Sequence, residues 1–306
     1  PLSVYTPALE AGYAVDAEVM DDDSLTYGDD AYSVSNYDRN SLYDTLPMYQ
    51  AIAESKNTSA VWLLDKLGIQ RGISKLEEFG ISIGEADENL GAIALGGMSK
   101  GVTPVQLASA YTTFVNEGVR TQARFITKIV DATGAVIVDN TKPKTNRVTT
   151  AAVAEEMTSM LMGVYADGGT GASAQPSNGM VIAGKTGTTE LDRETGYIKS
   201  QWMVGYTPDL VVATWLGYDK TNEIYNLNNA GKTMANLYSA EMGALLSISP
   251  QTEFAVAAAE ETYDSGIING LKNGLDEFMN DMGSFGQSLG EGSKKLFDWA
   301  NEAFGQ

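Results

Sequence analysis

Apolar residues recur at three- and four-residue intervals in two stretches between residues 46 and 68. This spacing places them on one face of a helix. The polar run Ser55-Lys56-Asn57-Thr58 separates the two stretches, and Gly68 closes the second one. The pattern predicts two helices that flank a short polar turn, with these residues on their buried faces: Met48, Ile52, Val61, Leu63, Leu64 and Leu67.

Three further helices and a hairpin are expected downstream. The run Thr103-Pro104-Val105-Gln106 combines an N-cap threonine, a proline in the first turn and a capping-box glutamine, and Gly118 closes the apolar stripe behind it. Residues 150–165 and 234–246 are the other predicted helices. Residues 124–139 are typical of a hairpin that turns at a Thr-Gly pair.

Short apolar runs replace the helical period near residue 180. Three of them, residues 180–184, 201–206 and 210–217, predict strands. Only Thr207-Pro208-Asp209 joins the last two, which is too short for a crossover helix, so this pair is expected to be antiparallel. The last run is apolar on both faces, which favours a central strand covered by helices on both sides.

Two regions lack a clear periodic pattern. Residues 16–44 are rich in Asp, Ser, Tyr and Asn, which indicates a long polar surface segment with short extended pieces. Its carboxylates could bind a cation, but the residue spacing of an EF-hand loop is missing, so a solvated loop is the favoured interpretation.

The second region is a predicted tail, residues 250–306, separable from a domain over residues 1–249. Its apolar residues keep helical spacing, but intervening glycines weaken a helix by about 0.5–1 kcal/mol each. The tail is either an amphipathic segment for a partner or membrane, or a mobile extension. Ten acidic and three basic residues from Gln251 to Gln306 disfavour an anionic membrane and favour the extension.

Charge and residue usage narrow the chemistry. The 306 residues include 20 Lys and Arg against 40 Asp and Glu, a formal net charge of -20. Such a chain repels a phosphate backbone, so nucleic-acid binding is disfavoured. The absence of Cys and His excludes thiol catalysis, zinc sites built on these residues and a Ser-His-Asp triad. A nucleophile in this protein would need Lys, Asp or Glu for activation.

Two motifs suggest a site. Lys185-Thr186-Gly187-Thr188 follows the first predicted strand, and its ammonium group, hydroxyls and close backbone approach suit an anionic, peptide-like ligand. An ordinary strand-to-turn junction is the alternative. In Ser55-Lys56-Asn57, Ser55 could relay a proton while Asn57 donates to a substrate carbonyl. The alternative is that Asn57 or Thr58 caps the following helix and Ser55 is a satisfied hydroxyl.

Together these motifs resemble the second and third motifs of serine acyltransferases that bind β-lactams. Over residues 1–249 the chain is similar to the transpeptidase domain of class A, bifunctional penicillin-binding proteins of Gram-positive bacteria. Four further segments match in the same order: residues 92–97, 103–108, 168–171 and 202–209.

The chain departs from that family at its first motif, Ser-x-x-Lys, which supplies the nucleophile and the lysine that activates it. No serine here has a lysine three residues on. Residues 1–10 resemble the stretch that follows this motif in the family. We therefore expect a fragment cut just after the catalytic lysine and inactive by itself, with a pseudoenzyme as the alternative.

The resemblance implies an α+β fold in which helices sandwich an antiparallel β-sheet. It implies a parent D,D-transpeptidase that cross-links peptidoglycan stem peptides through an acyl-enzyme. Ser55 would pass a proton to the leaving amine, Asn57 would orient the peptide amide, and Lys185 would keep the site positive. The Thr188 N–H would be one of two oxyanion donors. The implied substrate-binding residues are Thr186, Gly187 and Thr188.

The implied partners are a stem peptide ending in D-Ala-D-Ala, β-lactam antibiotics and cell-division or elongation proteins, with no nucleic acid, cofactor or metal. The implied location is the extracytoplasmic face of the membrane, with an anchor upstream of these residues. A D,D-carboxypeptidase or β-lactamase shares the motifs but uses water as acceptor. A non-catalytic module that binds stem peptides is the hypothesis from a different class.

Overall fold

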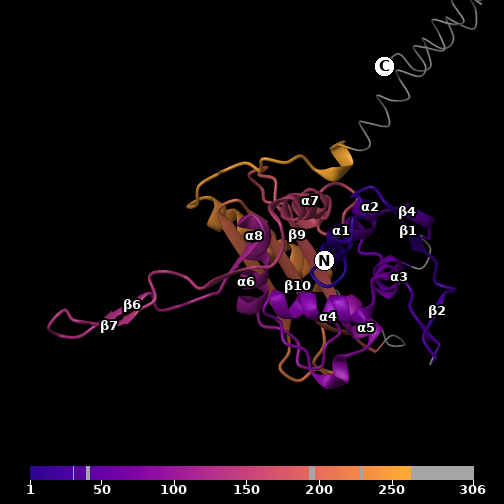
Figure 1. The fold of residues 1–306 in the computed structure, drawn as a ribbon, viewed down its shortest axis with the longest axis horizontal. Helices are drawn as coiled ribbons and strands as arrows, with labels where there is room; N and C mark the ends of the chain where they lie inside the picture. The colour runs from indigo at the N-terminus through magenta and orange to yellow at the C-terminus, as the bar shows by residue number, and fades with distance from the viewer. Residues whose placement is uncertain (30, 39–41, 193–196, 228–229, 263–306) are drawn as a thin grey trace, which may run out of the picture. The chain divides into compact units, whose positions relative to one another are not determined.

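The computed structural model describes residues 1–29, 31–38, 42–192, 197–227 and 230–262. The elements below lie in the unit Pro1–Ala259 (Figure 1). Its helices are α1 (Tyr5–Glu10), α2 (Met48–Ala53), α3 (Asn57–Leu67), α4 (Ile69–Glu78), α5 (Leu90–Leu95), α6 (Pro104–Val115), α7 (Ala151–Met162) and α8 (Ala230–Leu246), with the 3-10 turns η1 (Glu85–Asp87) and η2 (Ala172–Ala174). Its strands are β1 (Glu18–Asp21), β2 (Thr26–Tyr27), β3 (Tyr32–Ser33), β4 (Asp44–Pro47), β5 (Val119–Thr121), β6 (Lys128–Val130), β7 (Val136–Asp139), β8 (Thr145–Arg147), β9 (Ala183–Asp192), β10 (Tyr197–Thr207) and β11 (Leu210–Gly217).

The main sheet has the order β11-β10-β9 and is antiparallel throughout its described part. The expected antiparallel pair of residues 201–206 and 210–217 is confirmed. The prediction that residues 210–217 form the central strand is wrong, because β10 ladders with strands on both sides and β11 lies at an edge of the described sheet. The first predicted strand is also misplaced: β9 begins at Ala183 and continues to Asp192, so residues 180–182 precede it.

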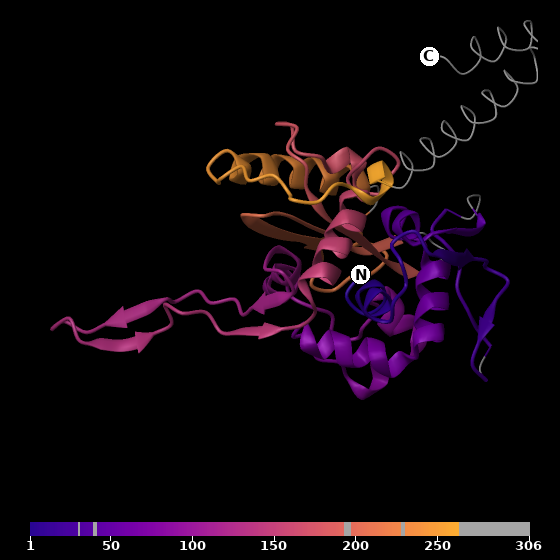
Figure 2. The ribbon, with the colours of Figure 1, turned by 45° about the horizontal axis from the view of Figure 1, so that its top comes forward.

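Helices cover both faces of this sheet, as expected for an α+β fold of this kind. On one face Tyr206 packs against Tyr111 and Phe114 of α6, at ring-centroid distances of 6.1 Å and 6.3 Å. On the other face α8 lies over the strands (Figure 2). There the Tyr238 hydroxyl donates to the Val212 carbonyl at 3.4 Å. The apolar run of β11 is thus explained by helices on its two faces rather than by a central position.

The predicted helices are confirmed. Thr103 caps α6 with both bonds of a capping box and Pro104 at its start, as the sequence indicates. Thr150 caps α7 by accepting from the Val153 N–H. Helices α2 and α3 flank the turn at Ser55, and α8 begins four residues before the predicted start.

The polar segment of residues 16–44 forms short strands, as predicted, with β1 paired to β4 and β2 to β3. It is not entirely a solvated surface, because Asp21 is fully buried and Asn36 is nearly so. Among the described residues, no group of three or more acidic side chains is arranged to hold a metal ion.

The predicted hairpin of residues 124–139 is confirmed as β6 and β7. It forms an arm that extends away from the helices (Figures 1 and 2). Gly134 has φ +87° in its turn, a conformation that glycine adopts without strain.

Part of the predicted tail packs on the core. Phe254 meets Tyr206 edge-on at 5.8 Å, and Thr252 donates to the Asp209 carboxylate through both its backbone N–H and its hydroxyl. The boundary at residue 250 stays a prediction, and residues 263–306 lie outside the described residues. Within the described part of the chain, no helix is long and apolar enough to cross a membrane.

Candidate active site

An open cleft of about 1510 Å³ brings the two sequence motifs together. The turn between α2 and α3 forms one wall, β9 and β10 form the other, and the first turns of α8 close one side. Among its lining residues are five of the predicted site residues, Ser55, Asn57, Thr186, Gly187 and Thr188. Segments about 130 residues apart in sequence therefore share one site.

Ser55 and Lys185 form the direct contact between the two walls. The Lys185 ammonium donates to the Ser55 hydroxyl at 2.7 Å and to the Thr186 carbonyl at 3.1 Å. Burial lowers the pKa of Lys185 from 10.5 to about 8. A lysine with a pKa near 8 exchanges its proton near neutral pH, so this pair can move a proton between the nitrogen and the serine oxygen.

Asn57 begins α3 but does not cap it. Its side-chain amide donates to the Ser35 carbonyl at 3.2 Å. No flanking side chain caps this helix; instead the Asn36 side-chain oxygen accepts from the backbone N–H groups of Asn57 and Thr58, at 2.8 Å and 3.2 Å. The hypothesis that Asn57 or Thr58 is the cap is wrong, because a distant residue fills that position.

The Lys-Thr-Gly-Thr motif lies inside β9 rather than after a strand, which corrects the sequence prediction. Register explains the difference: Lys185, Gly187 and Thr188 pair with Val204, Trp202 and Gln201 of the long strand β10. The apolar side chains end before the backbone ladder does, so composition understates the strand. The motif is therefore presented along a strand edge that borders the cleft.

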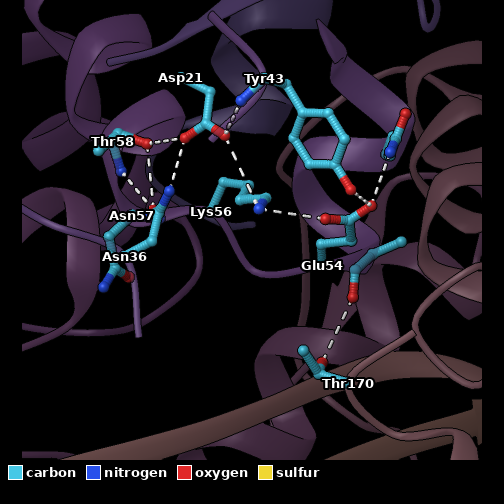
Figure 3. A network of polar contacts seen from close by, with 10 residues as sticks. Asp21, Asn36, Tyr43, Glu54, Lys56, Asn57, Thr58 and Thr170 are labelled. Atoms are coloured by element: carbon cyan, nitrogen blue, oxygen red, sulfur yellow. Dashed lines mark hydrogen bonds and ion pairs between the residues drawn. The ribbon is translucent and has the colours of Figure 1, made fainter. Parts of the chain in front are cut away.

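Three residues that sequence analysis did not assign to the site also shape it. Thr170 links the walls, since its hydroxyl lies 2.7 Å from the Thr186 hydroxyl and its backbone N–H donates to the Ala53 carbonyl at 3.1 Å. Asn36 and Asp21 support the turn from behind (Figure 3). Thr170 could have been found, because it lies in a matched segment of residues 168–171; nothing in the sequence pattern distinguishes Asp21 from its acidic neighbours.

Comparison with known proteins identifies the family of the chain. The family model for the penicillin binding protein transpeptidase domain matches residues 2–240. The chain belongs to this family. The chain is 40% identical over 262 residues to penicillin-binding protein 2a of Streptococcus pneumoniae, covering 85% of this chain and 34% of that protein. It is 38% identical to penicillin-binding protein 1F of Bacillus subtilis, covering 78% of this chain and 32% of that protein.

Solved structures support the same assignment. The penicillin-binding protein PonA1 of Mycobacterium tuberculosis superposes with a TM-score of 0.71 at 25% identity, covering 84% of this chain and 70% of that one. PonA1 in complex with penicillin V has a TM-score of 0.69 at 25% identity, covering 84% of this chain and 70% of that one. The chain spans about a third of the length of the curated relatives described above.

Proposed function

We propose that these residues form the substrate-binding part of a peptidoglycan D,D-transpeptidase of the class A, Gram-positive type. The observation that carries the proposal is the 2.7 Å contact between Lys185 and Ser55 at the side of a large cleft. Acyl transfer needs groups that take up and release protons, and a Ser–Lys pair can do this in a chain that has no histidine. The substrate is the D-Ala-D-Ala end of a stem peptide, and β-lactams take its place.

The nucleophile is a serine of a Ser-x-x-Lys motif supplied by polypeptide outside these 306 residues, since none of the serines present has a lysine three positions on. That serine attacks the carbonyl of the penultimate D-Ala, and the bond to the terminal D-Ala breaks. Ser55 passes the proton to the departing amine, while the charge of Lys185 favours the deprotonated partner. An amine of a neighbouring peptide then takes the acyl group.

The β9 wall binds the peptide. Thr186 and Thr188 hydrogen-bond the terminal carboxylate, and Gly187 leaves room for the substrate backbone against the strand. The Thr188 N–H is one of the two oxyanion donors, a group whose removal typically costs about 10²–10³ in rate. Asn57 orients the peptide amide from the opposite wall.

The full-length protein, meaning the longer polypeptide that contains this domain, acts at the extracytoplasmic face of the membrane, where its substrate is assembled. Cell-division or elongation proteins are its proposed partners. The similarity to curated penicillin-binding proteins supports this assignment.

Intact mass after incubation with benzylpenicillin tests the proposal. We expect one penicillin adduct on the full-length protein and none on the 306-residue chain alone. An adduct on neither would contradict the acyl-enzyme and leave a non-catalytic module that binds stem peptides. Product analysis with an amine acceptor then separates a transpeptidase, which forms the cross-link, from a carboxypeptidase, which releases a shortened peptide to water.

A further inference from the structure

Behind the Ser55 turn lies a buried polar cluster centred on Asp21 (Figure 3). One carboxylate oxygen of Asp21 accepts from the Asn36 amide at 2.6 Å and from the Thr58 hydroxyl at 2.5 Å. The other accepts from the Tyr43 backbone N–H at 3.2 Å and lies 3.7 Å from the Lys56 ammonium. A fully buried carboxylate with four partners fixes the positions of all of them, because each lost contact would leave a buried polar group unsatisfied.

Two of these partners control where α3 begins. Asp21 holds the Asn36 amide, and the Asn36 oxygen caps the N–H groups of Asn57 and Thr58. The Thr58 hydroxyl also donates directly to the Asp21 carboxylate. The first turn of α3 is thereby anchored to β1 rather than to its own preceding residues.

Lys56, the residue that follows Ser55, is held in place by its side-chain contacts. Its ammonium lies 3.2 Å from the Glu54 carboxylate and 4.6 Å from the centre of the Tyr43 ring, in addition to its contact with Asp21. Only 4% of the Lys56 side chain is exposed. The residues on both sides of Ser55 are therefore held by side-chain contacts, with the Lys56 side chain buried and the Glu54 side chain partly exposed.

Ser55 needs such support. Its φ is +58°, in the left-handed region that costs a residue with a Cβ free energy. A strained residue keeps its conformation only where its surroundings determine it, and here the next two residues are fixed by the Asp21 cluster. The strained backbone directs the Ser55 hydroxyl to Lys185.

We propose that Asp21 is a positioning residue for acyl transfer: by anchoring Lys56 and the start of α3, it places the Ser55 hydroxyl within hydrogen-bond distance of Lys185. This inference rests on the proposed function. Asp21 touches neither Ser55 nor Lys185 and acts only through the turn. Displacement of a proton-transfer group by even about 1 Å can cost about 10²-fold in rate, so the effect is measurable.

The test uses the full-length protein and a fluorescent penicillin, with the limiting acylation rate constant and the half-saturating concentration measured separately. Asp21→Asn should lower the rate constant by about tenfold and leave the half-saturating concentration unchanged, because the β9 wall is untouched. Asp22→Asn is the matched control: Asp22 is the next residue, only partly buried, and its carboxylate accepts from the Ser24 N–H. A purely structural role would reduce the fraction of protein labelled at the end point but not the rate constant of the labelled molecules.

A second comparison isolates the route. In a Ser55→Ala background, Asp21→Asn should add no further loss, because both changes remove the same positioned hydroxyl. An equal loss in both backgrounds would overturn the inference. If Asp21→Asn does not fold, Thr58→Val removes one Asp21 contact and should give a smaller fall in the same rate constant.

The outcomes also separate this inference from the proposed function. An unaltered full-length protein that takes up no penicillin would overturn both. If the unaltered protein is acylated and both Asp21→Asn and Thr58→Val have the same acylation rate constant as it has, the positioning role alone is overturned.

Discussion

The two walls of the cleft are built in different ways. The β9 wall is continuous in sequence, and its residues 185–188 are held by the backbone ladder to β10. The α2–α3 wall owes its shape to the side chains of Asp21 and Asn36 and the backbone N–H of Tyr43, all of which precede the turn they support. A strand presents a motif by register alone, whereas a strained turn needs buried polar contacts from elsewhere in the chain.

The largest expected effect is on the free energy of unfolding, when the buried cation of the α2–α3 wall is removed. Lys56→Met should lower the free energy of unfolding by about 3 kcal/mol, because the Asp21 carboxylate stays buried without its ion-pair partner. Lys66→Met is the control, since the exposed Lys66 lies 5.8 Å from the centre of the Trp62 ring and should contribute about 0.5 kcal/mol. Urea unfolding of the 306-residue chain measures both, and equal losses would remove the contrast between the walls.

On the other wall, Lys185→Met should lower acylation of the full-length protein by about 10²-fold, because the proton-exchanging partner of Ser55 is lost. Lys199→Met makes the same charge change at an exposed position of β10 and should leave the rate unchanged. Stopped-flow labelling with penicillin measures the rates, and a similar fall in both variants would assign the effect to net charge.

Backbone register on the β9 wall predicts a smaller effect on stability. A Cβ at Gly184 would lie 2.0 Å from the Val204 carbonyl oxygen, whereas one at Gly187 would lie 3.3 Å from the Trp202 Cβ. Gly184→Ala should lower the thermal midpoint by about 3–9 °C, and Gly187→Ala should lower it less. Scanning calorimetry measures both midpoints. A larger fall for Gly187→Ala than for Gly184→Ala would mean that backbone register does not hold this wall.

The smallest expected effect is on the pH profile. Lys185 has a pKa of about 8, so it is charged below that pH and loses its proton above it. If the charged form supports acylation, the rate constant should fall about tenfold for each pH unit above the pKa. Lys185→Arg keeps its charge to higher pH, so the alkaline limb of the profile should disappear or move upward. A profile that is flat across pH 8 in the unaltered protein would argue against a role for the Lys185 charge.

Local patterns in the sequence were enough for much of the fold. The capping box at Thr103, the two helices that flank the Ser55 turn and the short link between β10 and β11 depend on neighbouring residues, and each is found where the pattern places it. Both motifs of the cleft were identified as site residues on the same basis. Their roles in catalysis stay proposals.

Other features depended on partners that a local pattern does not contain. Strand β9 continues through the mostly polar residues 185–192 because β10 supplies hydrogen bonds. Strand β11 lies at an edge of the described sheet and is apolar on both faces because α6 covers one face and α8 the other. The cap of α3 comes from Asn36, so the expected local cap was wrong.

The sequence by itself determined the helices, the hairpin, the antiparallel pair and the residues of the two motifs, because propensity, capping and apolar period act between residues close along the chain. Only the tertiary structure decided that Asp21, among several adjacent aspartates, is buried with four partners, and that Lys185 lies 2.7 Å from Ser55 with a lowered pKa. Burial and distance depend on what packs around a side chain, and that is fixed by contacts between segments far apart in sequence.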